Sequence, residues 1–143
     1  MKKITFLYIL VFGIISCNLD DNKRIDNSDL IGKWNWVSTK GGINGNINET
    51  PASTGKIIHL SLKNDYTFSI IENGNEISNG TYEITMKRSI YSGEIERYIK
   101  LETIDQQNIG FVKNGIVSAF QSQTLQISDN FYDGIGSTFE KME

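Results

Sequence analysis

The hydrophobic positions of the chain follow two different patterns, one near the start and one after residue 30. The first is an apolar run over residues 4–15, interrupted only by Thr5 and Gly13 and preceded by Lys2 and Lys3. About twelve apolar residues suit the core of a signal peptide, whereas a membrane-spanning helix needs roughly 20. We therefore predict a signal peptide over residues 1–16.

The second pattern is a series of short stretches in which apolar and polar residues alternate, separated by Gly, Asn and Asp. Alternation with a period of two indicates β-strands, and no stretch keeps a helical period. The predicted strands cover residues 32–39, 54–63, 66–72, 77–86, 94–104, 108–113, 116–121, 124–128 and 136–142. The dipeptides Asn64-Asp65, Asn73-Gly74 and Asn114-Gly115 are typical of hairpin turns between such strands.

Strands of this number and spacing predict a single all-β domain over residues 30–143. Pro51, the only proline, lies in a glycine-rich loop at residues 41–54, so the strands can bond to neighbours on both sides. Eight or nine short strands joined by hairpins are typical of an up-and-down antiparallel β-barrel of about eight strands or of a sandwich. A closed barrel would leave no exposed strand edge.

Charge and cysteine content narrow the classes of function. Without Lys2 and Lys3, which leave with the predicted signal peptide, the formal charge changes from −3 to −5. No basic block is present, so we expect no nucleic acid partner and no patch for anionic lipid. Cys17 is the only cysteine, which fits an exported protein that uses its thiol for attachment.

The segment Ile14-Ile15-Ser16-Cys17 resembles the lipobox of bacterial lipoproteins. The resemblance implies cleavage before Cys17 and acylation of Cys17, which would tie the protein to a membrane. A plain secretory signal or an N-terminal anchor helix are the alternatives. Residues 17–29 are predicted to be the lipidated cysteine and a flexible polar tether. Its Asp20-Asp21 pair resembles the export signal of surface lipoproteins in Bacteroidetes-type bacteria, although acidic tethers are also common.

The segment Leu30-Ile31-Gly32-Lys33-Trp34 resembles the Gly-x-Trp opening of lipocalins and related calycins. Residues 32–42, 60–68 and 124–134 are similar to stretches of small lipocalin-like lipoproteins of Bacteroidetes. The resemblance implies that Gly32 and Trp34 close one end of the barrel. Many lipocalins pack an arginine of the last strand on this tryptophan. Here the only basic residue of the last predicted strand is Lys141. Arg97 lies too far before that strand in the sequence to correspond to this arginine.

Residues suited to catalysis or metal binding are sparse. His59, the only histidine, has no recognisable nucleophile or orienting partner, so we predict that the protein is not an enzyme and has no catalytic residue. A zinc site needs several ligands, and the chain offers one histidine and one cysteine, while residues 129–134 lack the spacing of a calcium loop. We therefore expect neither a metal nor a cofactor.

Aromatic residues on the predicted strands are the remaining candidates for a site. An eight-stranded barrel either fills its interior with side chains or holds one small ligand. As pocket residues we select Trp36, Tyr66, Phe68, Tyr82 and Phe111. The expected function is non-catalytic binding of a small apolar or amphipathic ligand by a monomer, lipid-anchored to the outer membrane on its periplasmic or surface face. The alternative is an interaction or structural lipoprotein with a filled barrel, which works through its loops.

Overall fold

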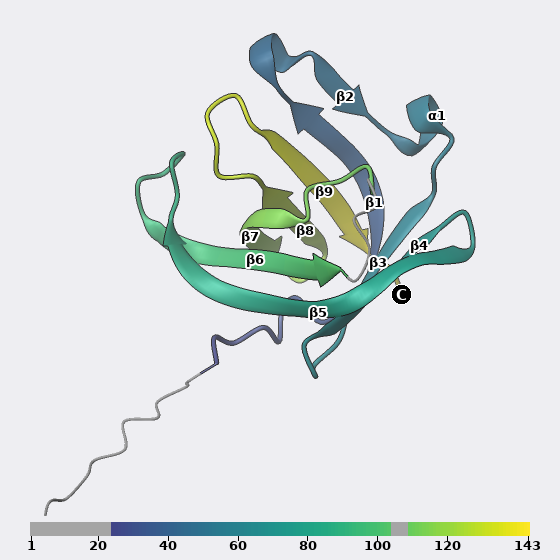
Figure 1. Ribbon diagram of the computed structural model, residues 1–143, viewed down its shortest axis with the longest axis horizontal. Coiled ribbons are helices and arrows are strands. Elements are labelled where there is room, and N and C mark those ends of the chain that lie inside the picture. Colours follow the sequence, from purple (N-terminus) through teal and green to yellow (C-terminus); the bar gives the residue numbers. More distant parts are fainter. Residues whose placement is uncertain (1–23, 104–108) are drawn as a thin grey trace, which may run out of the picture.

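The structure is a computed structural model that describes residues 24–103 and 109–143. In this part of the chain, nine strands form one antiparallel sheet that curls until its ends meet (Figure 1). The strands are β1 (Gly32–Gly41), β2 (Ile47–Glu49), β3 (Ile58–Leu62), β4 (Thr67–Glu72), β5 (Asn75–Arg88), β6 (Ile95–Thr103), β7 (Asn114–Phe120), β8 (Thr124–Ser128) and β9 (Ile135–Lys141).

Eight of these strands close into a barrel, and β2 is an addition at its rim. From β3 to β9 each strand pairs with the next one along the chain. The first half of β1 pairs with β3 on one edge, and β2 continues that edge. The other edge of β1 pairs with β9, from Trp34 opposite Lys141 to Gly41 opposite Ile135. The predicted up-and-down antiparallel barrel is therefore confirmed.

The alternation of the strands places one row of apolar side chains of each strand inside the barrel. On β3, for example, Ile58, Leu60 and Leu62 are buried while His59 and Ser61 are half-buried. The largest fully buried side chains are Trp34, Trp36, Phe68, Phe139, Leu30, Ile58, Leu60, Leu62, Ile70, Ile99, Ile109 and Leu125. This continuous core holds the strands together through the burial of apolar surface.

The connection before β7 differs from the prediction of a strand at residues 108–113. Residues 109–113 are irregular, and Ile109, Phe111 and Val112 pack into the apolar core. The Asn114-Gly115 hairpin prediction is also wrong, because both residues belong to β7 and pair with Lys100 and Ile99 of β6. A Cβ atom at Gly115 would lie 2.1 Å from the Ser128 carbonyl oxygen, so close strand packing requires this glycine.

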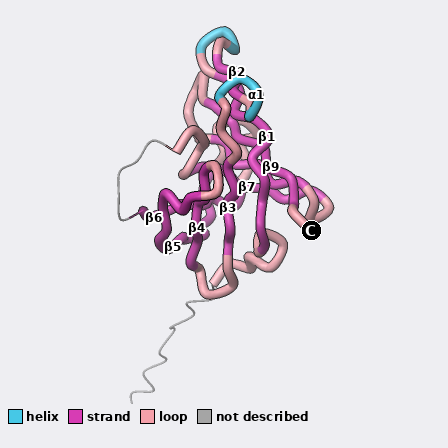
Figure 2. The backbone as a smooth tube through the Cα atoms, turned by 90° about the vertical axis from the view of Figure 1, so that its right-hand side faces the viewer, coloured by secondary structure: helices cyan, strands magenta, loops and turns pink. Residues whose placement is uncertain are grey.

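The glycine-rich loop after β1 has more local structure than the sequence indicated. It contains a 3-10 helix (Ile43–Gly45), strand β2 and one turn of helix, α1 (Pro51–Thr54), all at one end of the molecule (Figure 2). Thr50 caps α1 by accepting from the backbone N–H of Ser53, whose hydroxyl accepts from the N–H of Thr50. Gly55 ends the turn in the left-handed conformation.

The predicted signal peptide and Cys17 lie outside the described residues. Of the predicted tether, Arg24 to Asp29 are described, and they lie against the barrel, where Asn27 is buried. None of the helices in residues 24–103 and 109–143 has the length and apolar character that crossing a membrane requires.

Candidate functional site: two hollows of one barrel

The end of the barrel at the start of β1 is sealed around Trp34. The indole is fully buried, and its Nε1 donates to the carbonyl oxygen of Leu30 at 2.8 Å. The ammonium group of Lys141 lies 4.8 Å from the ring centroid and donates to the carbonyl oxygen of Ile31 at 2.8 Å. Gly32 has a φ of 144°, and a Cβ there would meet the Lys141 side chain at 2.7 Å. Lys141 of the last strand therefore packs against Trp34.

Side-chain contacts hold the segment before β1 across this sealed end. The Arg97 guanidinium donates to both carboxylate oxygens of Asp29 at 2.6 Å, and these hydrogen bonds lower the pKa of Asp29 below its ordinary value. The Tyr82 hydroxyl accepts from Asn27 at 2.6 Å and donates to the carbonyl oxygen of Lys63 at 2.7 Å. Burial raises the pKa of Tyr82, so the hydroxyl keeps its proton.

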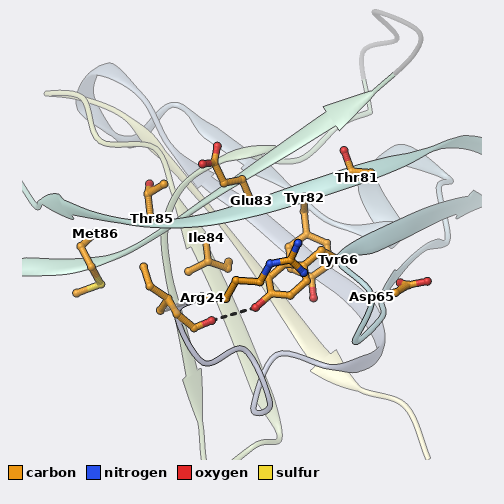
Figure 3. A pocket seen from close by; sticks show the side chains of 10 residues that line it. Arg24, Asp65, Tyr66, Thr81, Tyr82, Glu83, Ile84, Thr85 and Met86 are labelled. Carbon is orange, nitrogen blue, oxygen red and sulfur yellow. Dashed lines mark hydrogen bonds between the residues drawn. The ribbon is translucent and has the colours of Figure 1, made fainter. Parts of the chain in front are cut away.

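A hollow of about 760 Å³ lies beside this segment, and we call it the larger hollow (Figure 3). Tyr66 and Tyr82, two of the predicted pocket residues, both line it with ring centroids 5.3 Å apart. The Arg24 guanidinium lies 4.7 Å from the Tyr66 ring centroid, and the Tyr66 hydroxyl donates to the carbonyl oxygen of Ile25. Three of the polar groups in this hollow are thus already engaged with other parts of the protein.

The walls of this larger hollow come from both faces of β5. Tyr82 and Ile84 are buried, whereas Thr81 and Glu83, which alternate with them, are exposed. Figure 3 shows Glu83 and Thr85 on the side of the strand opposite Arg24 and Tyr66. Exposed side chains such as Arg24, Asp65 and Met86 form part of its wall, so we do not regard it as the interior ligand site that the sequence predicted.

The smaller hollow, of about 310 Å³, lies at the other end of β1, and we call it the mouth hollow. Trp36 and Phe111, two more of the predicted pocket residues, line it, and both are buried. Phe111 packs edge-to-face on Phe139, with ring centroids 5.2 Å apart. The remaining lining residues come from β1, β2, β9 and the connections between strands: Thr39, Ile47, Glu49, Thr54, Lys56, Gly110 and Ile135.

A buried network of hydroxyl groups supports the mouth hollow. Trp36 Nε1 donates to Thr39 Oγ1 at 3.0 Å, and Thr39 Oγ1 lies 2.8 Å from Ser137 Oγ. Thr39 also donates to the carbonyl oxygen of Gly110, and the N–H of Val112 donates to Ser137 Oγ at 3.0 Å. The network fixes the Trp36 ring and ties the irregular segment before β7 to β1 and β9.

The five predicted pocket residues therefore do not form one site. Tyr66 and Tyr82 meet at the larger hollow, Trp36 and Phe111 meet at the mouth hollow, and Phe68 is 2% exposed within the core. Sequence reasoning missed the polar and charged rim of the mouth hollow. Its charged members are Glu49 and Lys56, and Lys56 forms an ion pair of 3.2 Å with Glu72.

The other residues considered for chemistry are scattered. His59 is half-buried on β3. Among residues 24–103 and 109–143, no three His, Cys, Asp or Glu side chains come close enough together to hold a metal ion. Comparison of the chain with models of protein families, with curated proteins and with solved structures found no match.

Proposed function

We propose that the protein is a lipid-anchored, lipocalin-like barrel that binds a small apolar or amphipathic molecule without catalysing a reaction. The observation that supports this function is the mouth hollow, with Trp36 and Phe111 in its wall. Ligand sites are concave and mostly apolar, with a few placed polar groups, and their volumes start at roughly 300 Å³. Lys56 and Glu49 at the rim supply polar contacts for the head of an amphipathic ligand.

The two tryptophans provide a direct test, because Trp36 lines the mouth hollow and Trp34 lies at the sealed end. Variants Trp34→Phe and Trp36→Phe each keep one fluorophore. We would titrate both with anilinonaphthalene sulfonate and with straight-chain fatty acids from octanoate to palmitate. We expect saturable quenching of Trp36 in the first variant and little change of Trp34 in the second.

Matched substitutions assign the binding to one hollow. Phe111→Ala removes an aromatic side chain from the mouth hollow and is expected to weaken binding by about tenfold, or roughly 1.4 kcal/mol. Met86→Ala alters the larger hollow at a half-exposed side chain and is expected to leave the affinity unchanged. The same response of Trp34 and Trp36, or no saturation of either, would contradict binding at the mouth.

Membrane attachment is the second part of the proposal and rests on the lipobox-like segment that ends at Cys17. The proposed location is the outer membrane, on its periplasmic or surface face, with the acyl chains as anchor. In cells fed a labelled fatty acid, the protein is expected to carry label and to sediment with membranes. Cys17→Ser is expected to abolish both, and continued labelling of this variant would contradict the lipobox interpretation.

The filled barrel that acts through its loops is the competing function, and one observation favours it. Ile109, Phe111 and Val112 already occupy part of the barrel core. If no tested ligand saturates Trp36 fluorescence, surface recognition by the loops becomes the better explanation.

A further inference from the structure

Three aromatic side chains are strongly exposed on two connections that are distant in sequence. Tyr91, in the β5–β6 connection, is 58% exposed, and Phe131 and Tyr132, in the β8–β9 connection, are 71% and 86% exposed. Figure 1 shows both connections on the same side of the barrel. We call Tyr91, Phe131 and Tyr132 the aromatic platform.

Hydrogen bonds lock the two connections together beneath this platform. The side-chain amide of Asn130 accepts from the N–H of Ile90 at 2.9 Å and donates to the carbonyl oxygen of Arg88 at 2.9 Å. The Tyr91 hydroxyl donates to the carbonyl oxygen of Phe131, also at 2.9 Å. The exposed rings therefore stand on a backbone that is already ordered, which lowers the entropic cost of binding.

The three rings of the platform do not contribute to the apolar core, because they are exposed to solvent. Aromatic side chains carry a large apolar area, and a group of them on the surface marks an interaction site more often than a single exposed residue does. Hydrogen bonds fix the backbone of the β5–β6 and β8–β9 connections although their aromatic rings face solvent. The loop after β8 also requires Gly134, because a Cβ there would overlap Asp129 at 1.7 Å.

The charges around the platform are mainly negative. Asp129 and Asp133 flank Phe131 and Tyr132, and Glu94 lies in the same connection as Tyr91. The nearby cations are fewer: Arg88 donates to the carbonyl oxygen of Gly93, and the Lys87 ammonium lies 3.7 Å from the Tyr98 ring centroid. Burial and the charge of the Asp129 carboxylate raise the pKa of Tyr91.

We propose that the aromatic platform and its carboxylates form a docking site for a basic segment of a partner protein. Aromatic faces attract ammonium and guanidinium groups, and the carboxylates add charge complementarity. An anionic lipid surface or a nucleic acid would be repelled by the same carboxylates. The site is separate from the mouth hollow and does not depend on a ligand there.

A fluorescent oligoarginine peptide is a suitable probe, with oligolysine as a second cation and oligoglutamate as the control of opposite charge. Binding of each peptide to the full chain is measured by fluorescence anisotropy at several salt concentrations. We expect the Phe131→Ser/Tyr132→Ser variant to lose about tenfold in affinity. Asp133→Asn is expected to lose a smaller factor and to weaken the salt dependence. Because all three side chains are exposed, circular dichroism should show an unchanged fold.

Phe120→Ser is the matched control, because Phe120 is 54% exposed at the end of β7 and belongs to neither of the two connections. Its affinity for oligoarginine is expected to equal that of the unmodified protein. No binding of oligoarginine, or an equal loss in Phe120→Ser, would overturn the proposal. It would also be overturned if the platform variant lost binding to zwitterionic vesicles or neutral oligosaccharides while oligoarginine binding persisted. Anilinonaphthalene sulfonate binding at Trp36 should be unaffected in all three variants.

Discussion

Trp34 and Trp36 lie two residues apart on the same face of β1, and both are fully buried, yet they belong to ends of the barrel with different properties. At Trp34 the chain closes on itself, through Leu30, Ile31 and Lys141. At Trp36 the ring is held by Thr39 and borders an open hollow. The comparison shows that burial alone does not distinguish a structural tryptophan from a candidate binding residue. The neighbours of the ring distinguish them: other parts of the chain surround Trp34, whereas a hollow borders Trp36.

The largest effect is expected from Trp34→Ala. Removing a fully buried aromatic side chain leaves a cavity and costs about 3–5 kcal/mol of stability. The substitution also removes the ring contact of Lys141 and the hydrogen bond to the carbonyl oxygen of Leu30. Urea unfolding followed by far-UV circular dichroism measures the free energy of unfolding. A loss under about 1 kcal/mol would contradict a sealing role for Trp34, because such a value is ordinary for surface substitutions.

At the mouth, Thr39→Val is expected to cost about 2 kcal/mol while conserving side-chain shape. Thr39 is 2% exposed, and the substitution leaves the Trp36 N–H without its acceptor. Thr39→Val should also change the fluorescence emission of Trp36, which is measured in a Trp34→Phe background so that Trp36 is the only tryptophan. The comparison between the two ends would fail if Thr39→Val altered neither stability nor Trp36 emission.

The smallest effect is expected at the sealed end from Asp29→Asn. Its ion pair with Arg97 is bidentate but partly exposed, so we expect a loss of only about 1 kcal/mol at neutral pH. The pKa of Asp29 is lowered in the folded state, so its stabilisation is present above the unfolded value of about 3.9 and is lost as the pH falls. The difference in the free energy of unfolding between the unmodified protein and Asp29→Asn, measured by urea unfolding at several pH values, should therefore vanish in acid. A difference that is constant with pH would show that the ion pair is not its cause.

Local patterns predicted the strands because burial on one face imposes a period of two. These patterns failed where the same residue types occur in a different structural setting. Asn73-Gly74 forms the predicted turn with positive φ at both residues, whereas Asn114-Gly115 lies inside β7, where glycine is needed for close packing against Ser128. Residues 109–113 have an apolar composition suited to a strand but pack irregularly into the core.

The candidate site was less predictable than the fold because it is assembled from distant parts of the chain. The residues around Thr39 in the sequence do not predict its contact with Ser137, which is 98 positions away. The helical turn at α1 was not predicted, although Thr50, Pro51, Ser53 and Gly55 are residues typical of a capped turn. Trp36 and Phe111 were selected as aromatic strand residues, but their separation from Tyr66 and Tyr82 depends on the tilt and closure of the barrel.

The pairing of β1 with β9 has a consequence for how the barrel is made. Its first and last strands are neighbours, so the ring of hydrogen bonds stays open until β9 is available to join β8 to β1. Contacts between residues so far apart in sequence are slow to form, because a long loop must be closed before any of them contributes stability. During that interval β1 and β8 present unpaired edges, which favour association with other chains. The seven residues of β9 therefore determine when the chain passes from an aggregation-prone sheet to a protected barrel.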